Sequence, residues 1–319
     1  MNFRDIQRDL AALLPGTHES TAESTLELQG GASEAPRLVS AEILEDAEMK
    51  AHDVHRASST VFRAFLDGTQ KSRVARYVGT VPIIVGSVSA VVRERVERRM
   101  RTWKSALAED RIYAPRALLP AVTWSTLEAK FGASLADTRD DGENHAHPFA
   151  IREAAVHQVQ THREQIEYRL AGEWCESETE PLYVDGSISG SDKAAAACNA
   201  IGVVKSHRTL YANGPALNVV LAMAQNQRSS VFRIAPRKRA AVASWYLRLR
   251  DTADHNPLFG LVRVETALAT GSLTDRADEI SSWVLAETSP LALPDSRWDT
   301  MAYGIRDCEE YLRSIQFQP

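Results

Sequence analysis

The chain lacks most features that mark secreted, zinc-binding or membrane proteins. Its three cysteines, Cys175, Cys198 and Cys308, lie far apart and form no CxxC pair. This number and spacing argue against a disulfide framework and against a structural zinc site. No apolar run approaches the roughly 20 residues that cross a bilayer. The first residues lack the charged-then-apolar pattern of a signal peptide, so we expect a cytoplasmic protein without membrane contact.

An excess of positive charge is also absent. The 319 residues include 37 Lys and Arg against 42 Asp and Glu, which gives a formal net charge of −5. This balance argues against a protein that coats nucleic acid through bulk charge, but it leaves room for local basic patches. With 44% hydrophobic residues, the chain can bury a full core, and its length allows one large domain or two smaller ones.

The hydrophobic pattern changes near residue 58. Residues 1–57 are predicted to form a separable helical extension, because apolar residues recur there at helical spacing. Residues 58–319 alternate short β-rich segments with helical segments, which is typical of an α/β fold with a mixed sheet. The main predicted helices are Asp5–Leu14, Leu38–Ala51, Val88–Lys104 and Ile151–Trp174.

A motif of two apolar residues, Asp, Gly and Ser or Thr occurs twice, as FLDGT at 65–69 and YVDGS at 183–187. Each aspartate follows a predicted strand, and we expect a glycine turn after it. The carboxyl ends of neighbouring strands form the usual ligand-binding edge of an α/β sheet. Asp67 and Asp185 together would make an oxygen-rich site of the kind that Mn²⁺ and Mg²⁺ prefer. For either motif alone, a plain Asp-Gly turn is the favoured interpretation.

Two-metal phosphodiester chemistry usually requires further carboxylates. The predicted helix before Asp185 offers Glu153, Glu164 and Glu167, and the last two are spaced to project from one face. Arginines accompany them on this helix, so a solvated surface is the alternative interpretation, and from the spacing alone it is the better one.

Longer segments keep the order of the landmarks of one known protein family. They are FLDGTQ at 65–70, YVGTVPIIVGSVSAVVR at 77–93, a helix with glutamates, YVDGSISGS at 183–191, IGVVKSH at 201–207, RVE at 263–265 and PDSRWDTMAYGIRDCEEYLRS at 294–314. Over residues 58–314, roughly, this order resembles the NurA family of DNA-end-processing nucleases. The resemblance implies an RNase H-like core in 58–319, with 1–57 as an N-terminal helical extension.

The resemblance also implies an activity and a site. Members of the family are Mn²⁺- or Mg²⁺-dependent deoxyribonucleases of the 5′–3′ exonuclease and single-strand endonuclease type. Asp67 and Asp185 match the aspartates of the two motifs, and Glu164 is preferred over Glu167 as the helix glutamate. Asp299 is the candidate for a fourth metal ligand, where family members often have His.

Positive residues near these acids have two interpretations. Lys205 follows the apolar segment AIGVVK, and it either places charge near the scissile phosphate or points into solvent. Arg237, Lys238 and Arg239 form the densest basic cluster, which we expect to contact DNA phosphates without sequence preference.

The resemblance implies partners as well. Members form homodimers around a DNA channel and act with HerA, a hexameric ATP-driven DNA translocase, in DNA end processing for repair or in anti-phage defence. One alternative is a catalytically inactive DNA-binding subunit of such a complex. Another is a metal-dependent phosphoesterase that acts on small molecules.

Overall fold

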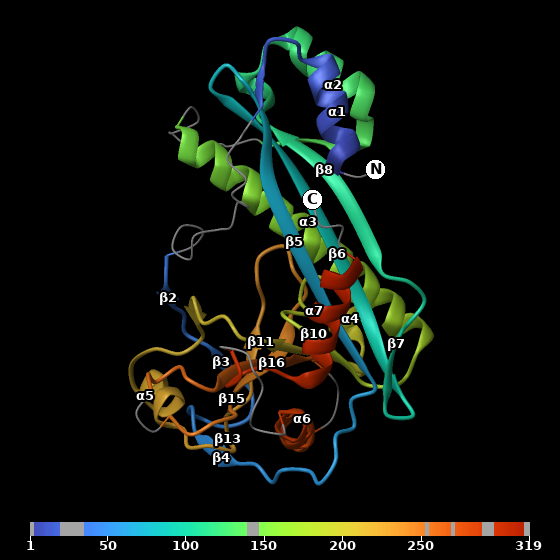
Figure 1. Cartoon of the computed structure of the whole chain (residues 1–319). Coiled ribbons are helices and arrows are strands. Elements are labelled where there is room, and N and C mark those ends of the chain that lie inside the picture. Colours follow the sequence, from blue (N-terminus) through green and yellow to red (C-terminus); the bar gives the residue numbers. More distant parts are fainter. Residues whose placement is uncertain are drawn as a thin grey trace.

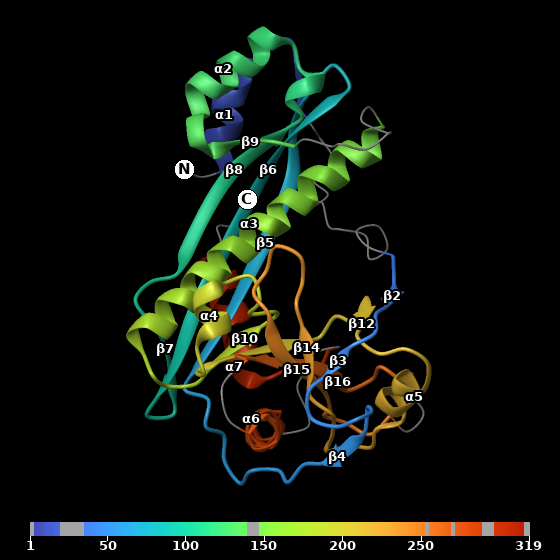
Figure 2. The same cartoon turned by 180° about the vertical axis from the view of Figure 1, so that it is seen from behind.

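A computed structural model describes residues 3–19, 35–138, 147–252, 255–268, 272–288 and 297–315. The predicted α/β class is confirmed, because one large mixed sheet has helices on both faces (Figures 1 and 2). The strand order along the main path of the sheet is β3-β14-β15-β16-β11-β10-β5-β6-β8-β9.

Three long antiparallel strands form the spine of the molecule. They are β5 (Ala64–Val78), β6 (Val81–Val96) and β8 (Leu107–Ala114). Two short strands, β10 (Leu182–Asp185) and β11 (Ala200–Val204), continue the sheet parallel to β5. Beyond β11, the sheet becomes antiparallel again through β16 (Leu261–Thr266) and β15 (Val242–Arg248).

The helix predicted over Val88–Lys104 is wrong. This segment forms the second half of β6 and then β7 (Arg99–Thr102), which pair as a hairpin. Valines dominate the first part, and β-branched residues fit a strand that is covered on both faces. The charged residues that suggested a helix lie where the hairpin extends beyond this cover, so Glu97, Arg98 and Arg99 are exposed.

Helices pack on opposite faces of the spine. The long helix α3 (Pro148–Ser177) covers one face, and its buried residues share a core with even-numbered residues of β5 and β6, such as Leu66 and Val92. Helices α6 (Leu273–Glu287) and α7 (Tyr303–Ile315) cover the other face with odd-numbered residues, such as Phe65 and Val91. Figures 1 and 2 show α7 and α3 on these two sides.

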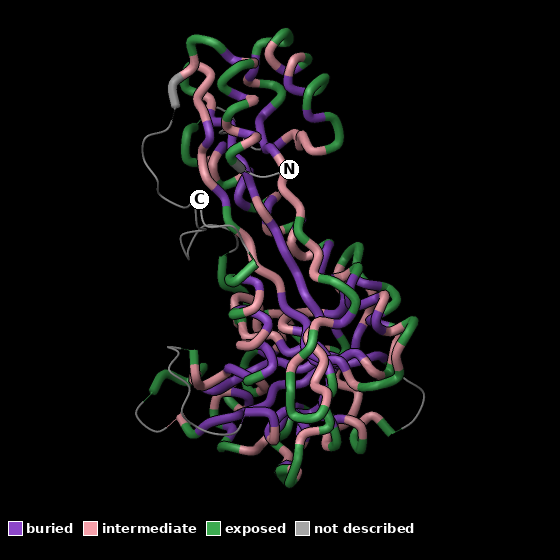
Figure 3. Tube along the Cα trace, turned by 45° about the vertical axis from the view of Figure 1, so that its right-hand side comes forward, coloured by how far each residue is buried: buried purple, intermediate pink, exposed green. Residues whose placement is uncertain are grey.

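A third core lies at the far end of the spine, in the smaller lobe beyond the narrow middle of the structure (Figure 3). Here α1 (Phe3–Leu13) and α2 (Ala121–Phe131) pack against the ends of β5, β6 and β8. The first predicted helix is therefore confirmed. Its Ile6 and Leu10 are fully buried, as their four-residue spacing on one helix face requires.

The second helix predicted in the N-terminal region, over Leu38–Ala51, is wrong. This segment contains β3 (Glu42–Ile43) and leads into β4 (Ala51–Asp53), which pair with β14 (Phe232–Ile234) and β13 (Gln227–Ser229). Long-range strand pairing therefore overrides the local helical spacing. Among the described residues of the predicted extension, β3 and β4 thus pair within the main sheet.

The remaining elements are short or peripheral. They are β1 (His18–Glu19), β2 (Arg37–Leu38), β9 (Leu135–Asp137), β12 (Thr209–Leu210), α4 (Asp192–Ala196), α5 (Gly214–Ala222) and the 3₁₀ turns Arg116–Leu118 and Gly132–Ser134. Within the described ranges, none of the helices combines the length and apolar character needed to cross a membrane.

Candidate functional site

The two aspartates of the repeated motif meet at one sheet position. Strand β10 pairs in parallel with β5, with Val184 beside Leu66, so Asp185 and Asp67 come next in register. Phe65 and Tyr183, two residues earlier, lie in the core under α6 and α7. Because side chains alternate along a strand, both aspartates project toward that same face. The predicted juxtaposition of Asp67 and Asp185 is therefore present.

The two motifs differ in local structure. Asp185 ends β10, and Gly186 has a φ of 132°, so the second motif forms the predicted turn. The turn predicted after Asp67 is wrong, because Asp67 and Gly68 lie within β5 and pair with β6. Strand β5 thus continues past the last residue of β10, and among the described residues its next partner on that edge is β1, which pairs at Arg76 and Tyr77.

Helix α3 brings a third carboxylate to this edge. A Cβ atom at Gly68 would lie only 2.2 Å from Oε1 of Glu167 and 2.9 Å from its Cδ. Glycine at position 68 therefore makes room for the Glu167 carboxylate against the strand. Glu167 is buried, with 6% of its surface exposed.

Crowding of these acids has an electrostatic cost. Burial raises the pKa of Asp67 well above its usual value, and the neighbouring charges of Asp185 and Glu167 raise it further. Burial also raises the pKa of Glu167 to about 7, with Asp185 contributing in the same direction. Carboxyl groups in such a position take up either protons or cations.

Two basic side chains partly balance the acids. Nζ of Lys205 lies 2.8 Å from Oδ2 of Asp185. Arg163, one turn before Glu167 on α3, donates from Nη1 to Glu167 and from Nε to Oε1 of Gln70 at 3.1 Å. Of the two interpretations of Lys205, the one that places it beside the acids fits this geometry. With three carboxylates and two cations, a fully ionised cluster keeps one negative charge.

The other predicted acids lie outside this cluster. Glu164, the preferred glutamate, accepts from Gln160 and pairs with Arg239. Glu153 lies 14 residues before Glu167, roughly 21 Å along the helix axis. Asp299 accepts a hydrogen bond at 2.9 Å from the backbone N–H of Gly260, and none of its interactions joins it to Asp67, Glu167 or Asp185.

The predicted basic cluster lies next to the acids. Arg237, Lys238 and Arg239 are exposed in the turn between β14 and β15. Nη2 of Arg239 lies 3.3 Å from Oε2 of Glu164, one turn of α3 before Glu167. Positive charge is thus available for a polyanion at the rim of the site.

Glu265 on β16 fixes the Asp185 turn, and sequence reasoning missed this role. Oε2 of Glu265 accepts from Oγ of Ser187 at 2.8 Å and from the N–H of Ile188 at 3.0 Å. The side chain is 1% exposed and pairs with Arg263. Arg163 was also missed, although its spacing of four residues from Glu167 is the pattern of a helix ion pair.

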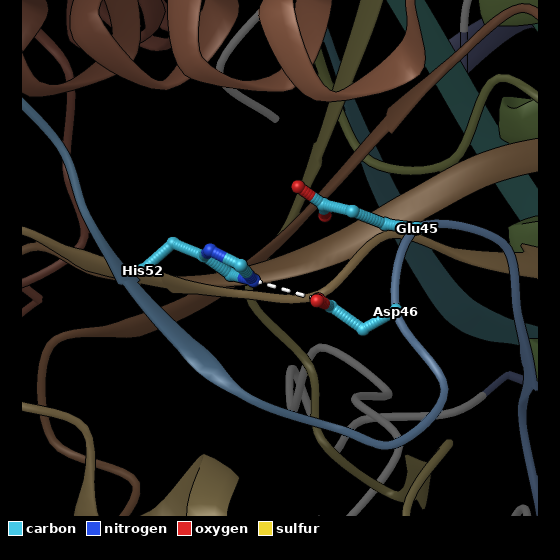
Figure 4. Close-up of side chains that lie close together, drawn as sticks. All are labelled: Glu45, Asp46 and His52. Carbon is cyan, nitrogen blue, oxygen red and sulfur yellow. Dashed lines mark hydrogen bonds and ion pairs between the residues drawn. The ribbon is translucent and has the colours of Figure 1, made fainter.

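A second group of potential metal ligands serves the fold. Glu45, Asp46 and His52 have ligand atoms within 4.8 Å of one another (Figure 4), whereas no choice of ligand atoms brings Asp67, Glu167 and Asp185 that close. Both oxygens of Glu45 accept from the buried Arg228, at 2.7 and 2.8 Å. Asp46 accepts from Ser230 and contacts His52. Protein partners thus satisfy the acids, which hold the segment between β3 and β4 to the sheet.

Comparison with known proteins assigns the chain to no family. No protein-family model matches the chain, and a search of curated proteins finds no significant match. The family, the activity and the partners implied by the resemblance therefore stay predictions.

Proposed function

We propose that the protein is a metal-dependent deoxyribonuclease that hydrolyses DNA phosphodiester bonds at the cluster of Asp67, Glu167 and Asp185. The single observation that carries the proposal is the position of the Glu167 carboxylate, which occupies the space of the side chain that Gly68 lacks. A structural ion pair needs no such arrangement, because Arg163 and Glu167 can pair on the helix surface alone.

The donor set suits a hard divalent cation such as Mn²⁺ or Mg²⁺. All three acids offer carboxylate oxygens, and their mutual repulsion is relieved when a cation binds between them. A bound divalent cation supplies an activated water and offsets the charge that develops on a phosphate. Lys205, which lies beside Asp185, would compensate the charge of a bound phosphate if Asp185 held the metal. The proposed ligand glutamate is therefore Glu167, and Asp299 is not included.

Further parts of the proposal rest on the resemblance and on surface charge. The exposed basic turn at 237–239 is proposed to contact DNA phosphates beside the acids. Assembly as a homodimer with a HerA-type translocase, and a role in end processing or anti-phage defence, belong to the same proposal.

A catalytically inactive DNA-binding subunit is the second candidate. One observation favours it: Lys205 and Arg163 already pair with Asp185 and Glu167, so these cations would compete with a metal for the two carboxylates. The two candidates differ in whether the protein takes up Mn²⁺ at the cluster.

Two matched pairs of variants test the proposal. Glu167→Gln and Glu164→Gln change the same helix, and Asp185→Asn and Asp299→Asn change two predicted ligands. Mn²⁺ binding is measured by calorimetry, and degradation of labelled linear single- and double-stranded DNA is followed with Mn²⁺. We expect E167Q and D185N to lose both metal binding and cleavage, while E164Q and D299N keep them.

The contrary outcomes are distinct. Equal cleavage by wild type, E167Q and D185N would point to a contaminating nuclease and reject the site. Absence of both Mn²⁺ uptake and cleavage in the wild type, with DNA binding intact, would favour the inactive subunit. Hydrolysis of nucleotides alone, unchanged when residues 237–239 are reversed in charge, would favour the small-molecule phosphoesterase.

A further inference from the structure

A pocket separate from the acidic cluster lies on the α7 face of the sheet. It has a volume of about 470 Å³, between the β6–β7 hairpin and the first turns of α7. This volume falls within the roughly 300–1,000 Å³ typical of ligand sites. The hairpin contributes Arg95, Arg98 and Met100, and the helix contributes Tyr303 and Arg306.

The charges around the pocket leave one arginine uncompensated. Arg95 pairs with Glu287, Arg306 with Glu310, and the adjacent Arg93 with Asp307. Arg98 is exposed, and within the described ranges it forms no ion pair. Four arginines therefore face three carboxylates, which gives this pocket a net charge of a single positive unit.

The backbone at the hairpin tip is unusual for the residues it carries. Glu97 and Arg98 join β6 to β7, and their φ angles are 49° and 63°. A two-residue hairpin with both φ angles positive is a type I′ turn, which strongly favours Asn and Gly. Glutamate and arginine are strained in this conformation, and such strain is concentrated at functional sites.

The pocket is also lined by an aromatic side chain, Tyr303, on which a planar ring could stack. Tyr303, at the start of α7, is 40% exposed, whereas Ile305 and Leu312 of the same helix are fully buried. Exposed aromatic side chains stack on unpaired bases without regard to sequence. A singly charged cationic pocket beside an aromatic ring matches one nucleotide of a strand, whose phosphodiester carries one negative charge.

We infer that this pocket binds one nucleotide of a single-stranded nucleic acid, with its phosphodiester on Arg98 and its base on Tyr303. The inference rests on the proposed nuclease function and names a substrate contact remote from the acids. Val91 pairs with Asp67 on the neighbouring strand, and Arg95 lies four residues further along β6, roughly 13 Å away. A nucleic-acid strand bound in the pocket would thus lie a short distance from the proposed cleavage site.

Binding of labelled oligo(dT) in EDTA tests the pocket, because the chelator prevents cleavage. Arg98→Gly is the informative variant, since glycine relieves the strained φ while removing the charge. We expect R98G to bind about fivefold more weakly, with a salt slope smaller by about 0.7, the value for one lost phosphate contact. Its thermal midpoint stays equal or rises, whereas Arg98→Lys retains binding.

Three further arms define the site. Tyr303→Ala is expected to bind oligo(dT) about tenfold more weakly but to bind an abasic strand like wild type. Arg4→Glu is the charge control for Arg98→Glu, because Arg4 is exposed on α1 at the opposite end of the molecule (Figure 1). Competition by dTMP distinguishes a free nucleotide from a strand, and we expect oligo(dT) to compete far better.

Unchanged affinity and salt slope in R98G and R98E would overturn the inference, as would an equal loss in R4E. Absence of oligonucleotide binding by the wild type would overturn it too. Cleavage with Mn²⁺ is measured separately. If the Arg98 variants bind oligo(dT) like the wild type and the wild type cleaves DNA, only the inference about the pocket is rejected. Failure of cleavage with intact, Arg98-dependent binding rejects the proposed function alone.

Discussion

Adding one methyl group at position 68 is the sharpest test of the acidic cluster. In Gly68→Ala, the new Cβ would lie 2.2 Å from Oε1 of Glu167, whereas ordinary contact begins near 3.4 Å. The carboxylate must therefore move by at least 1.2 Å. The atoms in the way belong to the end of a flexible side chain, so we expect Glu167 to give way and strand β5 to stay in register.

The expected result is a loss of activity without a loss of fold. Displacement of a catalytic group by about 1 Å can cost about 100-fold in rate. Alanine in a strand is favoured over glycine by roughly 0.5–1 kcal/mol, so the free energy of unfolding changes little. Mn²⁺-dependent DNA cleavage and Mn²⁺ affinity both fall, while the urea midpoint stays within error of the wild type.

Two variants control for this result. Gly172→Ala is the matched substitution on α3, because the added Cβ comes no closer than 3.4 Å to its nearest neighbours, and it should cleave normally. The double variant Gly68→Ala, Glu167→Asp should recover part of the metal binding, since the shorter acid leaves room for the methyl group. Full activity of G68A, or its global unfolding, would refute the reasoning.

Three further predictions concern stability and loop position. The pKa of Glu167 is about 7 when folded and near 4.5 when unfolded, so without metal the free energy of unfolding should fall as pH rises through this window. Glu167→Gln should reduce that decline, and the raised pKa of Asp67 accounts for what remains. Urea titrations at pH 5 and 8 in EDTA measure the free energy of unfolding, and an unchanged difference between the two pH values contradicts the prediction. Arg228→Met leaves the Glu45 carboxylate without its charged partner and should lower the free energy of unfolding by about 3–5 kcal/mol. Urea unfolding measures this loss, and a much smaller loss contradicts the prediction. Glu265→Ala frees Ser187 and should weaken Mn²⁺ binding by calorimetry more than it lowers the thermal midpoint, and an unchanged affinity rejects this role.

Local sequence patterns predict the α/β class, the long helix and two of the three acids of the proposed site. The apolar segments before Asp67 and Asp185 indicated strands, and two strands of one sheet place their aspartates together if they are neighbours in parallel. The strand–helix alternation correctly indicated the α/β class. The long helix α3 was also foreseen, because more than twenty residues lack proline and glycine.

Other features depend on contacts that no local pattern encodes. The charged half of β6 resembles a helix surface until its pairing with β5 and β7 is known. The choice between Glu164 and Glu167 is set by which of them faces Gly68, and both satisfy the same spacing. The family resemblance points to Asp299, whereas its partner in the structure is the Gly260 amide, near in space but 39 residues away in sequence.

The charges of the two proposed sites connect the two proposals. The acidic cluster keeps one negative charge when ionised, so without a cation it repels a phosphate. The pocket at the β6–β7 hairpin has the opposite sign and lies on the α7 face, toward which Asp67 and Asp185 also project, whereas Glu167 reaches the cluster from α3 on the other face. If both proposals hold, a nucleic-acid strand should bind first at the hairpin and should reach the acids only when a divalent cation reverses the local potential. The two proposals therefore predict that binding without metal and cleavage with metal depend on different residues, and the Arg98 and Gly68 variants test this separation.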